Sequence, residues 1–374
     1  MLRAACACPA PFRSTVGDEE LSTVTSLTPQ QWQQAHDSTG RVQKFRQTCK
    51  LIRKRGLAKE LRSQAWPLLL SCYAPDETIA GRQAVSDAAQ QELNSLLQQA
   101  AAPDAHNNFE LSSGGETWEQ NVRRIATDVN RTDCGSGNIT AEERSAIDAR
   151  LTHILTAYAY CDPVVGYCQG MADILSPFLL VFPQDDALAF MCFAAFMGQI
   201  RQNFLEGQPG VHSSIQHIGS LLQHADPKLW RQIEKLDMST GVFAFRMLVC
   251  QFRRELTFDD VFGFWERLWA AEQMAHCQLK DHCVAALLRL NRKQILRLRS
   301  PEDFIQFVNK DIIPLDGPAT IKAAYKLWKQ TGSKQKQQPA ASEKWQRLSK
   351  AETVPPKTSD TLKMHAQAAS EDQV

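Results

Sequence analysis

The sequence predicts an all-α fold, organised as one large helical domain with two helical subdomains. Between about residues 50 and 330, apolar residues recur at spacings of three and four, the period of helices that bury one face. This region contains no convincing run of alternating β-branched residues, the pattern typical of strands. The apolar segments also differ too much in length and spacing to form a stacked repeat array.

The clearest predicted helix begins at Thr140, whose hydroxyl can cap the amide of Glu143 while the glutamate side chain reaches back. Its apolar stripe passes through Leu151 and ends before Pro163. Other helices are expected over about residues 58–72, 84–100, 117–130, 164–181, 187–204, 213–224, 228–236, 242–254, 258–270, 279–290 and 319–329.

The composition is that of a packed protein without a strong overall field. A hydrophobic content of 43% in 374 residues is ample for a core, and 42 basic against 41 acidic residues leave a formal charge of +1. We therefore expect no nucleic-acid partner, and any charged partner has to be met by a local cluster. The eleven cysteines are scattered, several within apolar stretches, which favours reduced thiols and a cytoplasmic setting.

The domain is expected to span residues 43–330, between a flexible segment at 1–42 and a disordered polar tail at 331–374. The basic N-terminus holds Cys6 and Cys8 but lacks the apolar core of a signal peptide. A transit peptide or a palmitoylated cysteine pair remains an alternative to a simple disordered start. The most apolar region, 174–197, is divided at 183–186, so neither half reaches the roughly 20 residues of a transmembrane helix.

The sequence lacks the usual parts of a self-contained catalyst. Two His-Cys pairs, at 276–277 and 282–283, have no second ligand cluster and do not have zinc-site spacing, so we expect no metal. There is also no nucleophile elbow, no phosphate-binding glycine loop and no His-Glu-x-x-His motif. Any catalytic role must draw on chemistry that a partner supplies.

Three segments place polar residues beside aromatic residues or glycines at helix edges. In the first, Arg62 precedes Trp66 by one helical turn, and its guanidinium is expected to brace that ring or a nearby carboxylate. In the second, Asp128 and Arg131 lie one turn apart after Ile125, although an ordinary solvated ion pair at a helix end would also explain them.

The third segment is Gly166-Tyr167-Cys168-Gln169-Gly170. Its two glycines allow another molecule to approach the backbone closely, and they flank the polar side chain of Gln169. A loop leading into a helix explains the glycines but does not explain the glutamine between them.

In this order and at domain-scale spacing, the three segments resemble the TBC domain of Rab GTPase-activating proteins. The family has an R-x-x-x-W element, an I-x-x-D-x-x-R element and a Y-x-Q-G element. All three are intact here, at 62–66, 125–131 and 167–170. The resemblance covers about residues 43–330 and implies the all-helical fold of that domain.

The resemblance implies that the chain acts on a Rab-family GTPase in its GTP form and regulates vesicle trafficking. Arg131 would be an arginine finger and Gln169 a glutamine finger, both supplied in trans. Tyr167, Gly170 and Asp128 would position these fingers, whereas Ile125, Arg62 and Trp66 would support the fold. No cofactor of its own is implied, because the partner GTPase holds GTP and Mg²⁺.

Two other functions remain open. A protein of the same fold could bind a Rab without accelerating hydrolysis and act as a scaffold. A helical adaptor for an unrelated protein is the third class. For the GTPase-activating protein and for the scaffold, the implied location is the cytoplasm, with peripheral attachment to endomembranes through the Rab as an alternative.

Overall fold

The computed structural model describes residues 26–102, 105, 109, 117–133, 140–275 and 279–331. These ranges contain helices and two isolated bridges but no β-strand, which confirms the all-α prediction. The elements are α1 (Pro29–Gln34), α2 (Phe45–Arg55), η1 (Lys59–Leu61), α3 (Arg62–Leu69), α4 (Ile79–Ala100), α6 (Trp118–Val129), α7 (Ala141–Cys161), α8 (Met171–Val181), α9 (Asp186–Ile200), η2 (Arg201–Asn203), α10 (Pro209–Ala225), α11 (Pro227–Lys235), η3 (Val242–Ala244), α12 (Phe245–Val249), α13 (Phe258–Ala275), α14 (Leu279–Leu290), α15 (Arg292–Ile295), α16 (Pro301–Gln306), η4 (Phe307–Asp311) and α17 (Gly317–Thr331).

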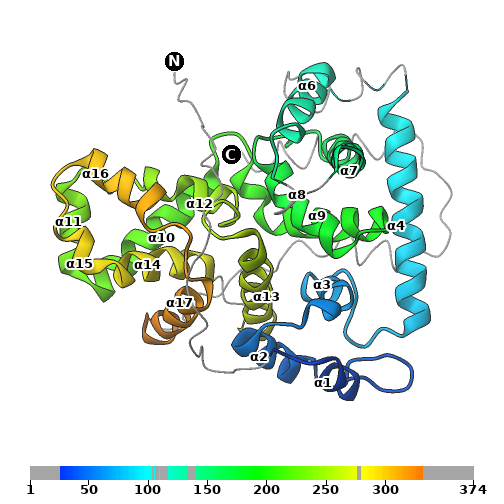
Figure 1. Cartoon of the computed structure of the whole chain (residues 1–374), viewed down its shortest axis with the longest axis horizontal. Helices are drawn as coiled ribbons and strands as arrows, with labels where there is room; N and C mark the ends of the chain where they lie inside the picture. The colour runs from blue at the N-terminus through cyan, green and yellow to red at the C-terminus, as the bar shows by residue number, and fades with distance from the viewer. Residues whose placement is uncertain are drawn as a thin grey trace, which may run out of the picture.

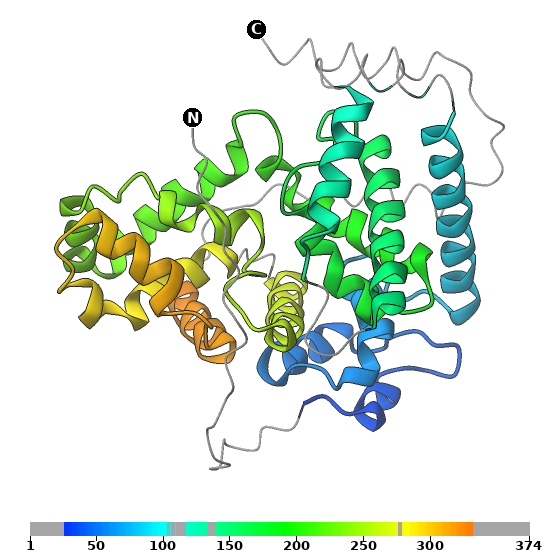
Figure 2. The ribbon, with the colours of Figure 1, turned by 45° about the horizontal axis from the view of Figure 1, so that its top comes forward.

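The helices form two groups that meet along α13. One group contains α4 and α6–α9, and the other contains α10–α12 and α14–α17 (Figures 1 and 2). Helix α13 contacts α2, α3 and α8 in the first half of the chain, and α14 and α17 in the second half. The prediction of two helical subdomains within one domain is thereby confirmed.

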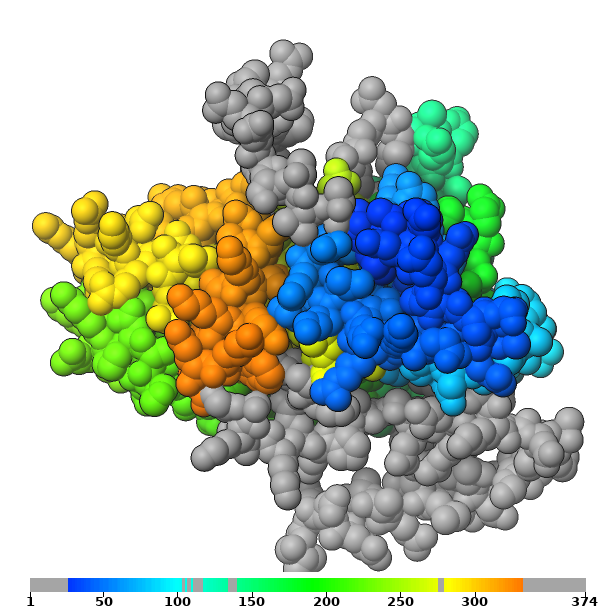
Figure 3. Space-filling model, turned by 90° about the horizontal axis from the view of Figure 1, so that it is seen from below, coloured from blue at the N-terminus to red at the C-terminus, as the bar shows by residue number. Residues whose placement is uncertain are grey.

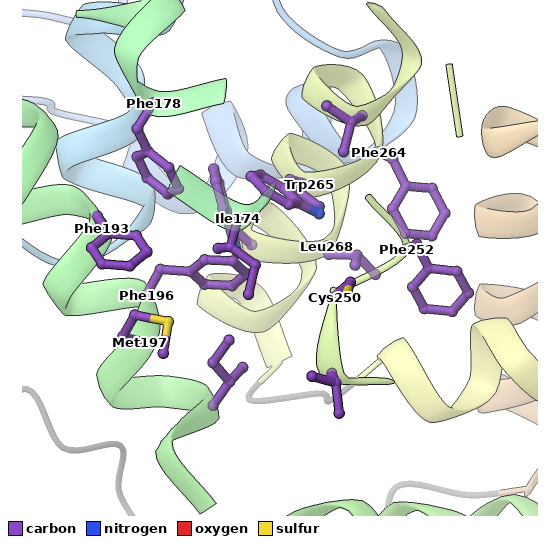
Figure 4. Close-up of a cluster of buried hydrophobic side chains, with 14 of the residues drawn as sticks. Ile174, Phe178, Phe193, Phe196, Met197, Cys250, Phe252, Phe264, Trp265 and Leu268 are labelled. Carbon is purple, nitrogen blue, oxygen red and sulfur yellow. The ribbon is translucent and has the colours of Figure 1, made fainter. Parts of the chain in front are cut away.

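A continuous aromatic core joins α8, α9 and α13 (Figure 4). Phe196 of α9 packs 5.3 Å from Trp265 of α13, measured between ring centroids, and Phe178 of α8 lies 5.9 Å from the same ring. Trp66 of α3 is fully buried and meets Trp269 edge to face at 4.9 Å. Aromatic pairs in this geometry stabilise more than their buried area alone.

A single buried carboxylate ties α3 to α13. Glu266 accepts hydrogen bonds from Arg62 Nε at 2.8 Å and from Trp66 Nε1 and the Leu57 amide, each at 3.3 Å. Burial raises the pKa of Glu266, and the charge of Arg62 opposes this rise. The sequence left either the Trp66 ring or a carboxylate as the partner of Arg62, and the structure shows a hydrogen bond to the Glu266 carboxylate. The Arg62 guanidinium also lies 4.5 Å from the centroid of the Phe262 ring.

The N-terminal boundary predicted at residue 43 is wrong, because the fold begins earlier. Leu27 and Trp32 are buried, and Trp32 donates from its indole nitrogen to Gln64 Oε1 at 2.9 Å. Helix α1 is capped by Thr28, which forms a capping box with Gln31. Residues 26–42 are therefore an integral part of the domain rather than a flexible segment.

Two predicted helices are shorter than expected because of left-handed backbone. The helix expected over 164–181 begins at Met171, since Gly166 and Gly170 have φ angles of 57° and 101°. The helix expected over 242–254 is divided into η3 and α12, and it ends at Val249 before Gln251 and Phe252, whose φ angles are 50° and 62°. Period-based reasoning cannot detect such breaks when the apolar pattern continues through them.

Several sequence-based expectations fall on residues outside those the structure describes. These are the Cys6 and Cys8 segment, the tail beyond residue 331, and the pair His276 and Cys277. The other pair, His282 and Cys283, is buried in α14. Among the described residues, no helix is both long and apolar enough to cross a bilayer.

Trp66→Ala is expected to lower the free energy of unfolding by about 3–5 kcal/mol, because it empties a fully buried aromatic site. Chemical denaturation followed by circular dichroism measures this loss. The control is Leu290→Ala, since Leu290 is 53% exposed and its truncation should cost far less. Equal unfolding free energies for the two variants would contradict the role assigned to Trp66.

Candidate functional site

Arg131 projects from the C-terminal end of α6. This helix begins with a capping box between Thr117 and Gln120 and ends at Val129 with Asn130 as its C-cap, so Arg131 comes directly after the cap. The Arg131 guanidinium forms an ion pair with Asp128, one turn earlier, and the Arg131 side chain is still 49% exposed. The arginine is thus oriented by a neighbour while its remaining donors face the outside.

Gln169 lies in the loop between α7 and α8, directly before the left-handed Gly170 that caps α8. Its side chain is exposed, whereas Tyr167 two residues earlier is buried. A side chain at Gly166 would collide with Asn121, because a Cβ there would lie 2.7 Å from Asn121 Oδ1. That same oxygen accepts from the Tyr167 amide at 2.6 Å. The glycine therefore lets α6 hold the loop by its backbone.

One carboxylate connects the Arg131 loop to the Gln169 loop. Asp128 holds Arg131 with Oδ1 and accepts from the Tyr167 hydroxyl with Oδ2 at 2.8 Å. Burial, together with the charge of Asp128, raises the pKa of Tyr167 well above its ordinary value, so the hydroxyl remains a donor at neutral pH. The sequence predicted roles for Asp128 and Tyr167 separately. The structure adds that they bind each other.

Two further arginines secure the Arg131 loop, and sequence reasoning missed both. Arg144 of α7 donates to the backbone oxygens of Thr132 at 3.0 Å and Val129 at 2.7 Å, where the end of α6 leaves carbonyls without helical partners. Arg253 donates to Asp133 at 3.0 Å and lies over the Phe258 ring at 4.0 Å. These contacts join residues as many as 120 positions apart, which no local pattern indicates.

The Gln169 loop is secured in the same way. Arg201 binds Asp162, at the start of the loop, through two hydrogen bonds of 2.7 and 2.8 Å. Arg254 donates twice to Asp173, in the first turn of α8, at 2.9 and 2.7 Å. Paired guanidinium–carboxylate contacts fix orientation as well as distance.

The remaining predicted residues support the fold at a distance from the two loops. Ile125 is 1% exposed and anchors α6 in the core. Arg62 and Trp66 belong to the Glu266 cluster between α3 and α13. An open cleft of about 340 Å³ lies between α6 and α7, lined by Asn130 and His153 among others, next to the Arg131 loop.

The arrangement presents a cation and an amide on two loops that share one support. Arg131 offers a planar fork of donors, which fits phosphate oxygens. Gln169 offers both a donor and an acceptor, which fits a water molecule and an oxyanion together. The two loops thus present chemistry for a phosphate group on one and for a polar ligand or a water molecule on the other, and both are tied to Asp128. Within the described residues, no group of three or more metal-ligating side chains occurs.

Tyr167→Phe is expected to lower the free energy of unfolding by about 1–3 kcal/mol, since the buried Asp128 Oδ2 loses its hydroxyl donor. Urea denaturation measures the loss. Tyr160→Phe is the matched control, because the Tyr160 hydroxyl makes no hydrogen bond within the described part of the chain. If both variants unfold at the same urea concentration, the shared-carboxylate arrangement contributes nothing to stability.

Comparison with known proteins places this geometry in a family. The Rab-GTPase-TBC domain model matches residues 59–296, a range that contains both loops. The chain is 30% identical to GTPase-activating protein GYP7 of Candida glabrata over 306 residues, covering 76% of this chain and 40% of that protein. It is 29% identical to TBC1 domain family member 17 of Homo sapiens over 272 residues, covering 72% of this chain and 40% of that protein.

A shorter match is closer in sequence. Rab GTPase-activating protein 22 of Arabidopsis thaliana is 41% identical over 122 residues, covering 33% of this chain and 22% of that protein. The chain thus spans less than half the length of these relatives. Among solved structures, the Ypt/Rab-GAP domain of Gyp1p matches 80% of this chain and 96% of its own, with a TM-score of 0.67 at 20% identity, a likeness of fold. The chain belongs to the Rab-GTPase-TBC domain family.

Proposed function

We propose that this protein accelerates GTP hydrolysis by a Rab-family GTPase, with Arg131 and Gln169 both acting in trans. The observation that carries the proposal is the Asp128 carboxylate, which holds Arg131 with one oxygen and the loop of Gln169, through Tyr167, with the other. The two exposed side chains are therefore presented as a unit. Family membership supports a Rab-family GTPase as the partner.

The chemistry required by GTP hydrolysis matches these two side chains. Negative charge grows on the phosphate oxygens in the transition state. An arginine guanidinium neutralises it, because this group stays protonated and its planar fork of donors fits phosphate oxygens. The attacking water needs an acceptor that orients it, and a glutamine amide can provide this while donating to the γ-phosphate. GTP and Mg²⁺ come with the partner, so the chain requires no cofactor of its own.

Preorganisation supports a catalytic role for the Arg131 loop. Arg144 binds backbone carbonyls of this loop, and Arg253 binds the Asp133 side chain. The loop therefore loses little conformational entropy when the partner binds. The Gln169 loop is restrained in the same way by Arg201 and Arg254, which bind Asp162 and Asp173. Side chains on restrained loops lose less entropy in a transition state than side chains on mobile ones.

The alternative is a scaffold that binds a Rab without raising its rate of hydrolysis. The intact pair of Arg131 and Gln169 favours the activating function, because a scaffold needs neither side chain in an exposed, supported position. As part of the same proposal, the protein takes the GTP form of the Rab as its substrate and acts in vesicle trafficking. It works from the cytoplasm, at endomembranes where the Rab is attached.

Arg131→Lys and Arg131→Ala are expected to lower stimulated hydrolysis by a factor on the order of 10³ or more, because lysine cannot reproduce the planar fork. Phosphate release from a panel of GTP-loaded Rabs measures this, with Arg231→Lys on exposed α11 as the control. Both Arg131 variants should still unfold in one cooperative transition, although Arg131→Ala should melt below the wild type because the buried Asp128 loses its cationic partner. Full activity in Arg131→Lys would exclude the finger role, and a panel that binds the protein without any stimulation would favour the scaffold.

Gln169→Ala is expected to abolish most stimulation even when the Rab retains its own water-positioning glutamine. Conversely, a Rab variant without that glutamine should still respond to the wild-type protein, since Gln169 supplies the orienting amide. Single-turnover hydrolysis distinguishes the two effects from binding. Gln294→Ala on α15 serves as the matched control, because Gln294 is also exposed. A Rab without its glutamine that fails to respond would mean that the chain contributes only Arg131.

A further inference from the structure

Two rows of basic side chains lie next to each other on α2 and α17, far from the finger loops in the fold. On α2 the spacing is four, three and one, and on α17 it is four and three, so each row occupies one side of its helix. We name this surface the basic face. It comprises Arg46, Lys50, Arg53, Lys54, Lys322, Lys326 and Lys329.

A contact between the Arg53 guanidinium and the Tyr325 ring joins the two rows. The Arg53 guanidinium of α2 lies 3.7 Å from the ring centroid of Tyr325 on α17, and Lys329 Nζ lies 4.9 Å from the same centroid. Trp328 stacks beside Tyr325, with 5.3 Å between ring centroids. Figure 3 shows α2 in blue and α17 in orange side by side on the face seen from below. The basic face is therefore continuous across the two helices.

The positive charge of this face is not compensated within the described part of the chain. Neither helix contains an acidic residue. No ion pair or hydrogen bond to an acidic side chain engages any of the seven basic residues in the described ranges, where the buried Nε of Arg53 also lacks an acceptor. The whole chain carries a formal charge of only +1, so the seven cations of this face form a local excess that the overall charge does not reveal.

We propose that the basic face binds the surface of an anionic lipid bilayer. Clustered lysines and arginines are each attracted to the negative surface potential of such a membrane, which a single isolated cation would feel only weakly. Tyrosine and tryptophan side chains favour the boundary between headgroups and water, where their rings are partly buried. Tyr325 and Trp328 are half-buried beside the lysines, so the surface offers both kinds of contact.

A bilayer fits this face better than a nucleic acid does. Single strands are held by aromatic rings whose faces are free to stack on bases. Here Arg53 lies over the Tyr325 ring and Trp328 stacks against it, so the ring faces that a base would need are occupied, while part of the half-buried Tyr325 side chain remains exposed. Five of the seven basic residues are lysines, which act as point charges toward a diffuse negative surface rather than as forks for individual phosphates.

The basic face and the finger loops lie on different sides of α13. Helix α13 contacts α8, which follows the Gln169 loop, and it also contacts α2 and α17. In Figure 1, α6 and α7 lie at the top and α2 with α17 at the bottom. Membrane binding by the basic face is therefore independent of the proposed action on a GTPase, and either proposal can fail without the other.

Co-sedimentation with vesicles tests the proposal in the absence of any GTPase. The full chain should bind vesicles of phosphatidylcholine mixed with phosphatidylserine and leave pure phosphatidylcholine vesicles unbound. Replacing Lys50, Lys54, Lys322 and Lys326 together with glutamine should weaken binding by a factor on the order of 10³, at about 1 kcal/mol for each lysine. The matched control replaces the exposed Lys228, Lys235, Lys293 and Lys310 with glutamine, which changes the net charge equally and should preserve binding.

Two further measurements keep the outcome clear if the fourfold variant folds poorly. Lys326→Gln alone should weaken binding roughly fivefold, and added salt should release the wild-type protein as its charges are screened. Equal binding by the fourfold variant and its control, or binding to neutral vesicles, would overturn the proposal. Tighter binding to a single-stranded RNA oligonucleotide than to the anionic vesicles at the same salt would assign the face to nucleic acid instead.

Discussion

The carboxylate of Asp128 is the interaction on which the site depends. It is nearly buried, and a buried charge is costly unless its oxygens are paired. Arg131 pairs with one oxygen and Tyr167 with the other, so the cost of burying the charge is offset only when both loops are in place. The position of one loop is thereby coupled to the position of the other. Asn121 adds a second link, because its amide oxygen holds the backbone of Tyr167.

The rest of the fold keeps that arrangement at a fixed place. Gly170 begins α8, and α8 carries Phe178 into the aromatic core that includes Trp265 of α13. Dense aromatic packing resists small displacements, because every shift opens gaps among close-packed rings. Glu266 strengthens the same centre by binding Arg62 and Trp66 from the other side. The start of α8 therefore cannot move without disturbing contacts in both halves of the chain.

Local signals in the sequence predicted the all-α class and most of the helices after residue 58, but they missed α1 and α2. The capping box predicted between Thr140 and Glu143 begins α7 where the structure places it, since a cap depends on residues only three positions apart. The three short motifs singled out Arg131 and Gln169, whose side chains are exposed, together with Asp128 and Tyr167, which the structure joins by a hydrogen bond. The chemistry of each of these residue types is intrinsic, so it can be read without knowing the fold.

What could not be predicted depends on contacts between distant segments. Residues 26–42 belong to the fold partly because Trp32 hydrogen-bonds Gln64, which is 32 positions away. The sequence could not indicate which carboxylate pairs with Arg62, because Glu266 is 204 positions away. Arg253 and Asp133 are likewise matched only by the folded chain. The glycine loop before α8 was assigned to a helix because its apolar pattern continues the helical period, whereas its φ angles break it.

Helix α13 lies between the finger loops and the basic face, and this sets how far a GTPase bound at the loops would be from a membrane bound at the basic face. On the two proposals above, a GTPase would contact the loops attached to α6 and α8, whereas a bilayer would contact α2 and α17 on the other side of α13. Helices pack with axes about 8–10 Å apart, so two such spacings would separate the GTPase from the membrane by roughly 16–20 Å. A GTPase anchored in that same membrane would need a flexible tether of about five or six extended residues to reach Arg131 and Gln169. Tether length would then select among partners whose catalytic surfaces are otherwise alike.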